Sequence, residues 1–239
     1  MTQAETIRAS LAVVEELDSA IEMTVAGMSA LIPTGARRAD LDATLQHLAS
    51  GFERFGKLTY IEAYRYTKHE RPGGSVLKRH RHDILGLIDA LVGLVEGTSD
   101  YTIRPAVRED LEFIRSDQGL RDLLGVLSHF GQRGRYSRID GLVAGGGGGD
   151  VESEPSRQWD EIELRLMMSR TDWEEVIATS EAERAGAREV VGRLQRLARA
   201  IARMWTLGAL GEGGSVHYGM LAVLLGVRDE QLGLVVPSR

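Results

Sequence analysis

The amino-acid sequence predicts an all-α protein, an up-and-down helical bundle with additional helices in its C-terminal part. Apolar residues recur three or four positions apart through much of the chain, which is the spacing that places them on one face of a helix. The five prolines, at positions 33, 72, 105, 155 and 237, fall between these periodic stretches, where they do least harm. No stretch shows the sustained two-residue alternation of a strand, so no sheet is predicted.

The first two helices are predicted to form a hairpin. Apolar residues of the stretch 7–32 share one face, and Thr2 with Glu5 matches a capping box at its start. A second helix is predicted to begin near Asp40 and to end at residues 71–74, because their sequence Arg-Pro-Gly-Gly disfavours a continuing helix.

Three further helical segments are predicted before the middle of the chain. One helix is predicted over residues 75–97, because its apolar residues keep a single face. Two shorter helices are predicted over 106–115 and 118–131, and Asp117 is placed to cap the second of them. Residues 135–143 are predicted to add another turn or two.

Residues 144–156 combine a run of glycines with acidic side chains. Such a segment buries nothing, and we predict a flexible loop. Because neither flanking part has the pattern of a complete bundle, the whole chain, residues 1–239, is predicted to be a single helical domain.

Beyond this loop the sequence predicts three more helices. The first opens at Ser156. Thr171 with Glu174 matches a second capping box, which predicts a long helix that ends near Gly208. A last helix is predicted over residues 216–225.

The composition is that of a globular chain. Apolar residues make up 43% and charged residues 27%, which is too apolar for a disordered protein. The absence of cysteine excludes disulfides, a thiolate nucleophile and Cys-ligated zinc. No apolar run reaches signal-peptide or membrane-spanning length, so a cytoplasmic location without a membrane partner is predicted. The net charge of −6 argues against nucleic-acid binding by the whole surface and directs attention to local patches.

Residues 54–81 are the most basic stretch of the chain. Against only two acids, Glu62 and Glu70, this stretch contains eight cations: Arg54, Lys57, Arg65, Lys68, Arg71, Lys78, Arg79 and Arg81. Three tyrosines, at positions 60, 64 and 66, lie among them, and cations beside aromatic rings are typical of single-stranded RNA or DNA binding. The alternative is a solvated helix end and loop, because charge runs usually face water.

A second group of arginines occupies positions 184–203. These arginines lie opposite an apolar helix face, and the preceding stretch 140–183 contains twelve carboxylates against three arginines. We therefore predict a structural role for this stripe.

Two histidines, His80 and His82, stand beside Asp83, and a histidine next to a carboxylate suggests a general base or a metal ligand. Adjacent helical residues point apart, however, so no metal site is predicted, and no phosphate-binding loop or nucleophile elbow predicts a cofactor or a serine hydrolase. His82 lies off the main apolar line and is predicted to be a histidine hydrogen-bonded between helices.

Two groups of short motifs resemble one branch of the HEPN-like helical proteins over residues 48–163. The first group comprises residues 51–57 (GFERFGK), Pro72, 77–78 (LK) and 82–84 (HDI). The second comprises residues 127–130 (LSHF), 135–136 (RY), 139–140 (ID), Trp159 and 162–163 (IE).

The resemblance implies a helical bundle within a superfamily that includes toxin ribonucleases, antiphage proteins and noncatalytic RNA- or nucleotide-binding modules. Its ribonuclease signature, an arginine followed after four to six residues by a histidine, is missing from this sequence. The resemblance marks Glu53, Arg54, Lys57, His82 and Asp83, which two packed helices would bring together. Their spacing predicts a Glu53–Lys57 pair, and a buried polar network that sets the helix register is the alternative to a functional site.

Three functions are therefore considered. The first is a HEPN-like component of a bacterial defence or toxin system, which binds RNA, a nucleotide or a partner protein through residues 54–81. The second is a metal-independent endoribonuclease in which His82 or His80 is the base and Arg54, Lys57 or Arg135 stabilises the developing charge. The third is a structural module that forms a homo-oligomer through the apolar face of residues 7–32.

Overall fold

The computed structural model describes residues 2–32, 40–134, 154–179 and 182–236. Within these residues every regular element is helical, so the predicted all-α bundle is confirmed. Among the helices of the same residues, none combines the length and the apolar composition that a membrane crossing requires. The helices are α1 (Gln3–Leu31), α2 (Leu41–Lys68), α3 (Gly74–His80), α4 (Ile84–Glu96), α5 (Ser99–Thr102), α6 (Pro105–Ser116), α7 (Gln118–His129), α9 (Pro155–Met168), α10 (Trp173–Ile177), α11 (Ala182–Thr206), α12 (Glu212–Ser215) and α13 (Tyr218–Leu225), with a π-helical turn at Phe130–Gly134 and a 3-10 turn at Asp229–Gln231.

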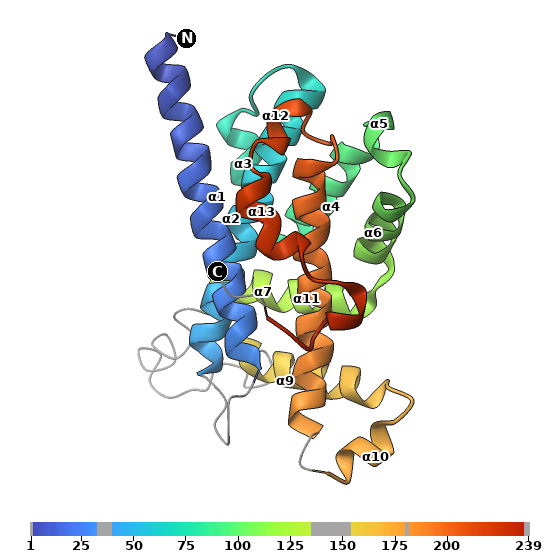
Figure 1. Ribbon diagram of the computed structural model, residues 1–239. Helices are drawn as coiled ribbons and strands as arrows, with labels where there is room; N and C mark the ends of the chain where they lie inside the picture. The colour runs from blue at the N-terminus through green and yellow to red at the C-terminus, as the bar shows by residue number, and fades with distance from the viewer. Residues whose placement is uncertain (1, 33–39, 135–153, 180–181, 237–239) are drawn as a thin grey trace, which may run out of the picture.

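Helices α1, α2, α4 and α11 form the body of the bundle (Figure 1). Helices α1 and α2 make an antiparallel hairpin, and α2 packs in turn against α4 and α11. Helices α7 and α9 run across these four helices instead of beside them (Figure 1). One hydrophobic core includes Phe52, Trp159 and Trp205, so side chains from before and after residues 135–153 are buried together.

Three of the predicted helix starts are confirmed. Thr2 accepts a hydrogen bond from the backbone N–H of Glu5 at 3.3 Å, and the Glu5 carboxylate accepts one from the N–H of Thr2 at 2.7 Å, which completes the capping box. Asp40 caps α2, and Asp117 caps α7 by accepting from the N–H of Leu120 at 2.7 Å.

The helix predicted over residues 75–97 is wrong, because the chain breaks it into α3 and α4. Asp83 starts a new helix at the break, where its Oδ1 accepts a hydrogen bond from the N–H of Gly86 at 2.9 Å. An aspartate that caps in this way competes with the continuing helix for backbone N–H groups. Asp83, a candidate catalytic residue, is therefore the N-cap of α4.

The long helix predicted to start at Thr171 is also wrong. A short helix, α10, precedes α11, and its N-cap is Asp172, whose carboxylate is held by Arg170 at 2.8 and 2.9 Å and caps no backbone N–H. The Thr179 hydroxyl donates to the carbonyl of Val176 at 2.7 Å and so competes with the backbone at the end of α10.

The helical turns predicted at 135–143 and most of the loop predicted at 144–156 lie outside the described residues. The last two residues of that loop are helical, because α9 begins with Pro155 at its first turn, where a missing N–H costs nothing.

The apolar face of residues 7–32 is divided into two parts. From Leu17 onward it is buried or half-buried, and Ile21 and Met28 are fully enclosed in the core. Ile7 and Leu11 are 53% and 56% exposed. The predicted dimerisation face is therefore used mostly within the chain, because α2 covers its C-terminal part.

Candidate functional site

A polar network joins the middle of α2 to the break between α3 and α4. Glu53 lies at its centre, with its side chain 13% exposed. One carboxylate oxygen accepts a hydrogen bond from Lys57 Nζ at 2.5 Å, and the other lies 2.9 Å from Nδ1 of His82. The predicted Glu53–Lys57 pair is confirmed, and so is the prediction that His82 is hydrogen-bonded to a neighbouring helix.

The other two residues that the resemblance marks lie outside this network. Arg54 points from α2 toward α1, where its Nη1 lies 3.2 Å from Ser19 Oγ and 3.5 Å from Glu16 Oε1. Adjacent positions on a helix face different directions, so Arg54 does not follow Glu53. Asp83 caps α4 through its bond to Gly86.

The network has a geometry suited to proton transfer. A carboxylate beside Nδ1 orients an imidazole and favours a proton on that nitrogen, which leaves Nε2 to accept one. The His82 side chain is 43% exposed, so a ligand has access to the ring. The π-helical turn approaches it closely, since a Cβ added to Gly131 would lie 3.1 Å from His82 Cβ. In the described part of the chain, no three His, Cys, Asp or Glu side chains are placed to hold a metal ion.

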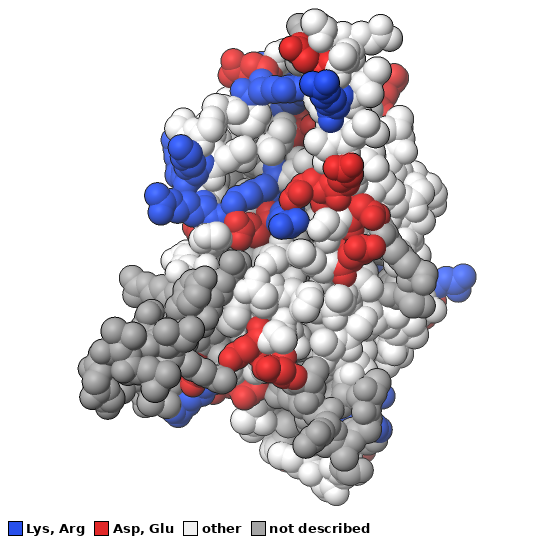
Figure 2. Space-filling view, turned by 90° about the vertical axis from the view of Figure 1, so that its left-hand side faces the viewer, with Lys and Arg blue, Asp and Glu red and all other residues white. Residues whose placement is uncertain are grey.

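The eight cations of residues 54–81 divide into two groups. Arg54, Lys57 and Arg65 each pair with an acid of α1 or α2. The other five are exposed and form no ion pair with another described residue; we call Lys68, Arg71, Lys78, Arg79 and Arg81 the cationic surface. Figure 2 shows the side of the molecule that lies to the left in Figure 1, where Lys and Arg side chains gather on the upper part with acidic side chains beside them.

The tyrosines of this stretch differ in their access to solvent. Tyr60 is buried, with its ring centroid 6.0 Å from that of Tyr64 and 6.1 Å from that of His80. The hydroxyl of Tyr64 donates to Glu70 at 3.3 Å. Only Tyr66, of the three, is more than a third exposed, at 39%. Tyr60 is therefore not the aromatic platform that the sequence suggested, because its ring belongs to the core.

The arginines of α11 have mainly structural partners, as predicted. Their guanidinium groups bind acids of α11 itself and of other helices and turns, or pack on an aromatic ring. The contacts are Arg193 with Asp117 and Glu189, Arg199 with Asp229 and the carbonyl of Val227, Arg203 with Asp110, and Arg196 over the ring of Phe113 at 4.1 Å.

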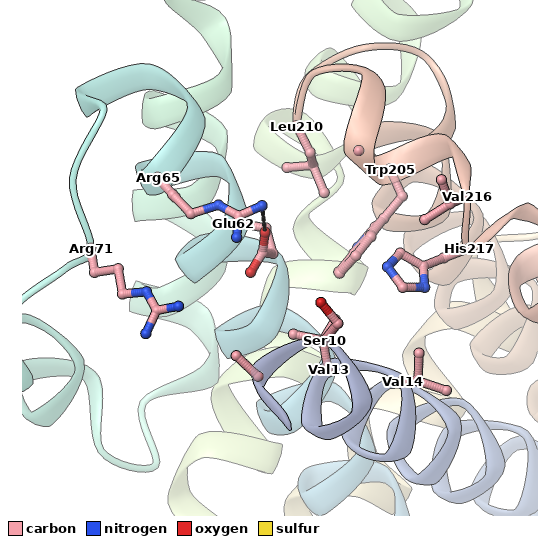
Figure 3. A pocket seen from close by; sticks show the side chains of 13 residues that line it. Ser10, Val13, Val14, Glu62, Arg65, Arg71, Trp205, Leu210, Val216 and His217 are labelled. Atoms are coloured by element: carbon pink, nitrogen blue, oxygen red, sulfur yellow. Dashed lines mark ion pairs between the residues drawn. The ribbon is translucent and has the colours of Figure 1, made fainter. Parts of the chain in front are cut away.

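Sequence reasoning missed a pocket of about 400 Å³ between the N-terminal half of α1, the end of α2 and the α11–α12 corner (Figure 3). Ser10, Glu62 and Arg71 line it together with Trp205 and His217. These residues come from both ends of the chain, so no local spacing signals the site. The half-buried His217, whose ring meets that of Trp205 edge-on at 5.3 Å, was not among the candidates.

No protein-family model, curated protein or solved structure matches this chain. The resemblance to HEPN-like proteins therefore stays a prediction from the short motifs of residues 48–163.

Proposed function

We propose that this protein binds single-stranded RNA through the cationic surface without cleaving it, as a HEPN-like component of a bacterial defence or toxin system. The observation that carries the proposal is the set of five exposed cations on the end of α2, the following loop and α3. None of them forms an ion pair with another described residue, so no acid of the described part of the chain is paired with these side chains in competition with RNA phosphates.

Two further features favour RNA at this surface. The chain has a net charge of −6, which confines phosphate binding to a local patch and disfavours contacts elsewhere. Tyr66 lies at the end of α2 and is 39% exposed; one side of its ring packs against Gly211, and the exposed remainder offers a base a stacking surface.

Replacing Arg79 and Arg81 together with alanine is expected to weaken RNA binding and its salt dependence. For a single strand, each phosphate that the protein no longer neutralises makes the negative slope of log K against log salt shallower by about 0.7. Fluorescence anisotropy of an end-labelled oligonucleotide across a potassium chloride series measures both quantities.

The matched control is the Arg104→Ala, Arg188→Ala variant, which also removes two exposed arginines. Arg104 lies directly before α6, and Arg188 lies on α11. It should keep the wild-type slope. Equal weakening in the two variants, or no binding by the wild type at low salt, would show that the cationic surface is not an RNA site.

The His82–Glu53 pair favours a second candidate, a metal-independent endoribonuclease. In that mechanism His82 Nε2 removes the proton of a ribose 2′-hydroxyl, whose oxygen attacks the adjacent phosphorus to form a 2′,3′-cyclic phosphate. The 5′-oxygen of the next nucleotide leaves and takes up a proton from water. Lys57, which shares Glu53 with His82, is the nearest cation of the network for the developing charge. Arg54 is turned toward α1, and Arg135 lies outside the described residues.

If this second candidate is right, His82→Ala abolishes cleavage of end-labelled RNA while the thermal unfolding of the protein changes little. The control is His47→Ala, because His47 is exposed on α2 and its Nδ1 lies 2.8 Å from the carbonyl of Ala43 in its own helix. Intact RNA after incubation with the wild type would eliminate the ribonuclease, and salt-sensitive binding in the same assay would favour the noncatalytic protein.

A further inference from the structure

The pocket between α1, α2 and α12 has one charged wall and one aromatic wall (Figure 3). Arg65 and Arg71 extend toward it from the end of α2 and the following loop, and Trp205 and His217 face them from the opposite side. Arg65 Nη2 lies 2.7 Å from Glu62 Oε2, which also lines the pocket. Arg71 forms no ion pair with another described residue.

The charges of these groups do not cancel. Glu62 and Arg65 neutralise each other, while Arg71 adds one positive charge. Burial lowers the pKa of His217 below its ordinary value, against a smaller raising effect of Glu62, so the ring is neutral at pH 7. The pocket therefore carries one positive charge without a partner, at its α2 side.

The rest of the lining is largely apolar. Val13 and Leu210 continue the hydrophobic core into the pocket. Val14 and Val216, which also line it, are 38% and 77% exposed. An apolar ligand that covers these side chains removes apolar surface from water, and this burial lowers the free energy of the complex.

We infer that this pocket binds a small aliphatic monocarboxylate. Its carboxylate lies at Arg71, within reach of those N–H groups of Arg65 that Glu62 leaves free, and its chain lies against Val14, Trp205 and Val216. A guanidinium has five N–H donors in a planar fork, so Arg65 retains donors beside its ion pair. A volume of about 400 Å³ is within the usual range of small-molecule sites.

Two observations disfavour a nucleotide in the same place. Because Arg65 neutralises Glu62, only the charge of Arg71 is left in the pocket, and it cannot balance the two or three negative charges of a phosphorylated ligand. Trp205 is 1% exposed, so only part of its edge, and no open ring face, is available for a base. One negative charge and an aliphatic chain therefore fit the walls better. This inference does not depend on RNA binding, although Arg71 belongs to both sites.

Isothermal titration of the full chain with octanoate, 1-octanol and adenosine monophosphate tests the inference. Octanoate should bind with one-to-one stoichiometry, and octanol should bind about tenfold more weakly because it lacks the charge-assisted hydrogen bonds. Arg71→Ala should weaken the binding of octanoate by about the same factor. The control Arg188→Ala, an exposed arginine of α11 outside the pocket, should leave octanoate binding unchanged.

A second pair of variants tests the place of binding. Ala9→Phe puts a large side chain on the α1 wall and should abolish octanoate binding, whereas Ala12→Phe, on the exposed side of the same helix, should not. Unchanged thermal melting of both variants excludes a loss of fold. Three results would overturn the inference: no octanoate binding, octanoate binding that survives Ala9→Phe, or octanoate binding no tighter than that of octanol. If adenosine monophosphate binds more tightly than octanoate, the pocket is a nucleotide site instead.

Discussion

Replacing Arg203 with methionine is expected to lower the free energy of unfolding by about 3–5 kcal/mol at pH 7. Arg203 Nη1 donates to Asp110 Oδ2 at 2.7 Å, and the Asp110 side chain is only 3% exposed. The pair joins α11 to α6, and without Arg203 the buried Asp110 carboxylate loses this hydrogen bond and its compensating charge. Urea denaturation of the variant and the wild type measures the difference.

The effect should depend on pH in a defined direction. Burial raises the pKa of Asp110 above its ordinary value of 3.8, against the lowering effect of Arg203. The folded protein therefore holds this proton at a higher pH than the unfolded chain does, so the contribution to stability is fully present below the unfolded pKa and is lost as the pH rises through the folded pKa. Removal of Arg203 raises the folded pKa further, and the gap between variant and wild type should narrow as the pH falls toward 4.

The matched control removes both charges. In the Asp110→Leu, Arg203→Met variant no charge stays buried, so most of the lost stability should return. If instead the single variant is destabilised by the same free energy at pH 4 and pH 7, or the double variant is no more stable than the single one, the unpaired carboxylate is not the cause.

Replacing Trp205 with alanine is expected to cost about 3–5 kcal/mol of stability. The indole is 1% exposed at the end of α11, and its Nε1 donates to Thr59 Oγ1 at 2.8 Å, a bond between residues 146 positions apart. Thr59 keeps its own bond to the carbonyl of Phe55 at 2.7 Å, so the main destabilisation comes from the cavity. Denaturant unfolding followed by circular dichroism gives the change.

Two variants bracket this result. Trp173→Ala removes a half-buried indole from the short helix α10 and should cost much less. Trp205→Phe fills more of the cavity and should retain part of the stability without the bond to Thr59. A Trp205→Ala protein as stable as Trp173→Ala would mean that the corner of α11 and α12 does not depend on this side chain.

Local patterns predicted the helices well where the cause is local. The capping box of Thr2 with Glu5 and the pairing of Glu53 with Lys57 each join residues three or four positions apart, so spacing alone locates them. The break at Asp83 was missed, because the apolar spacing continues from Leu77 to Ile84. There the capping carboxylate and the bond from His82 to α2 stabilise a break that periodicity does not report.

The candidate site was predicted only in part for the same reason. Glu53 and His82 were expected to meet, but the spacing of residues 54–81 does not tell a paired cation from an unpaired one. Arg54 meets an acid of α1, whereas Arg79 meets none in the described residues. The pocket, with lining from Ala9 to His217, left no local signal at all.

The residue pattern was enough to predict the all-helical class, the first helix hairpin and several helix caps, because apolar periodicity and capping act within one or two turns of backbone. Tertiary contacts were needed to establish which cations have no acidic partner, which histidine gains a carboxylate and where a cavity remains. Those outcomes depend on distances between side chains far apart in the chain, such as Asp110 and Arg203, which are 93 positions apart and 2.7 Å from each other.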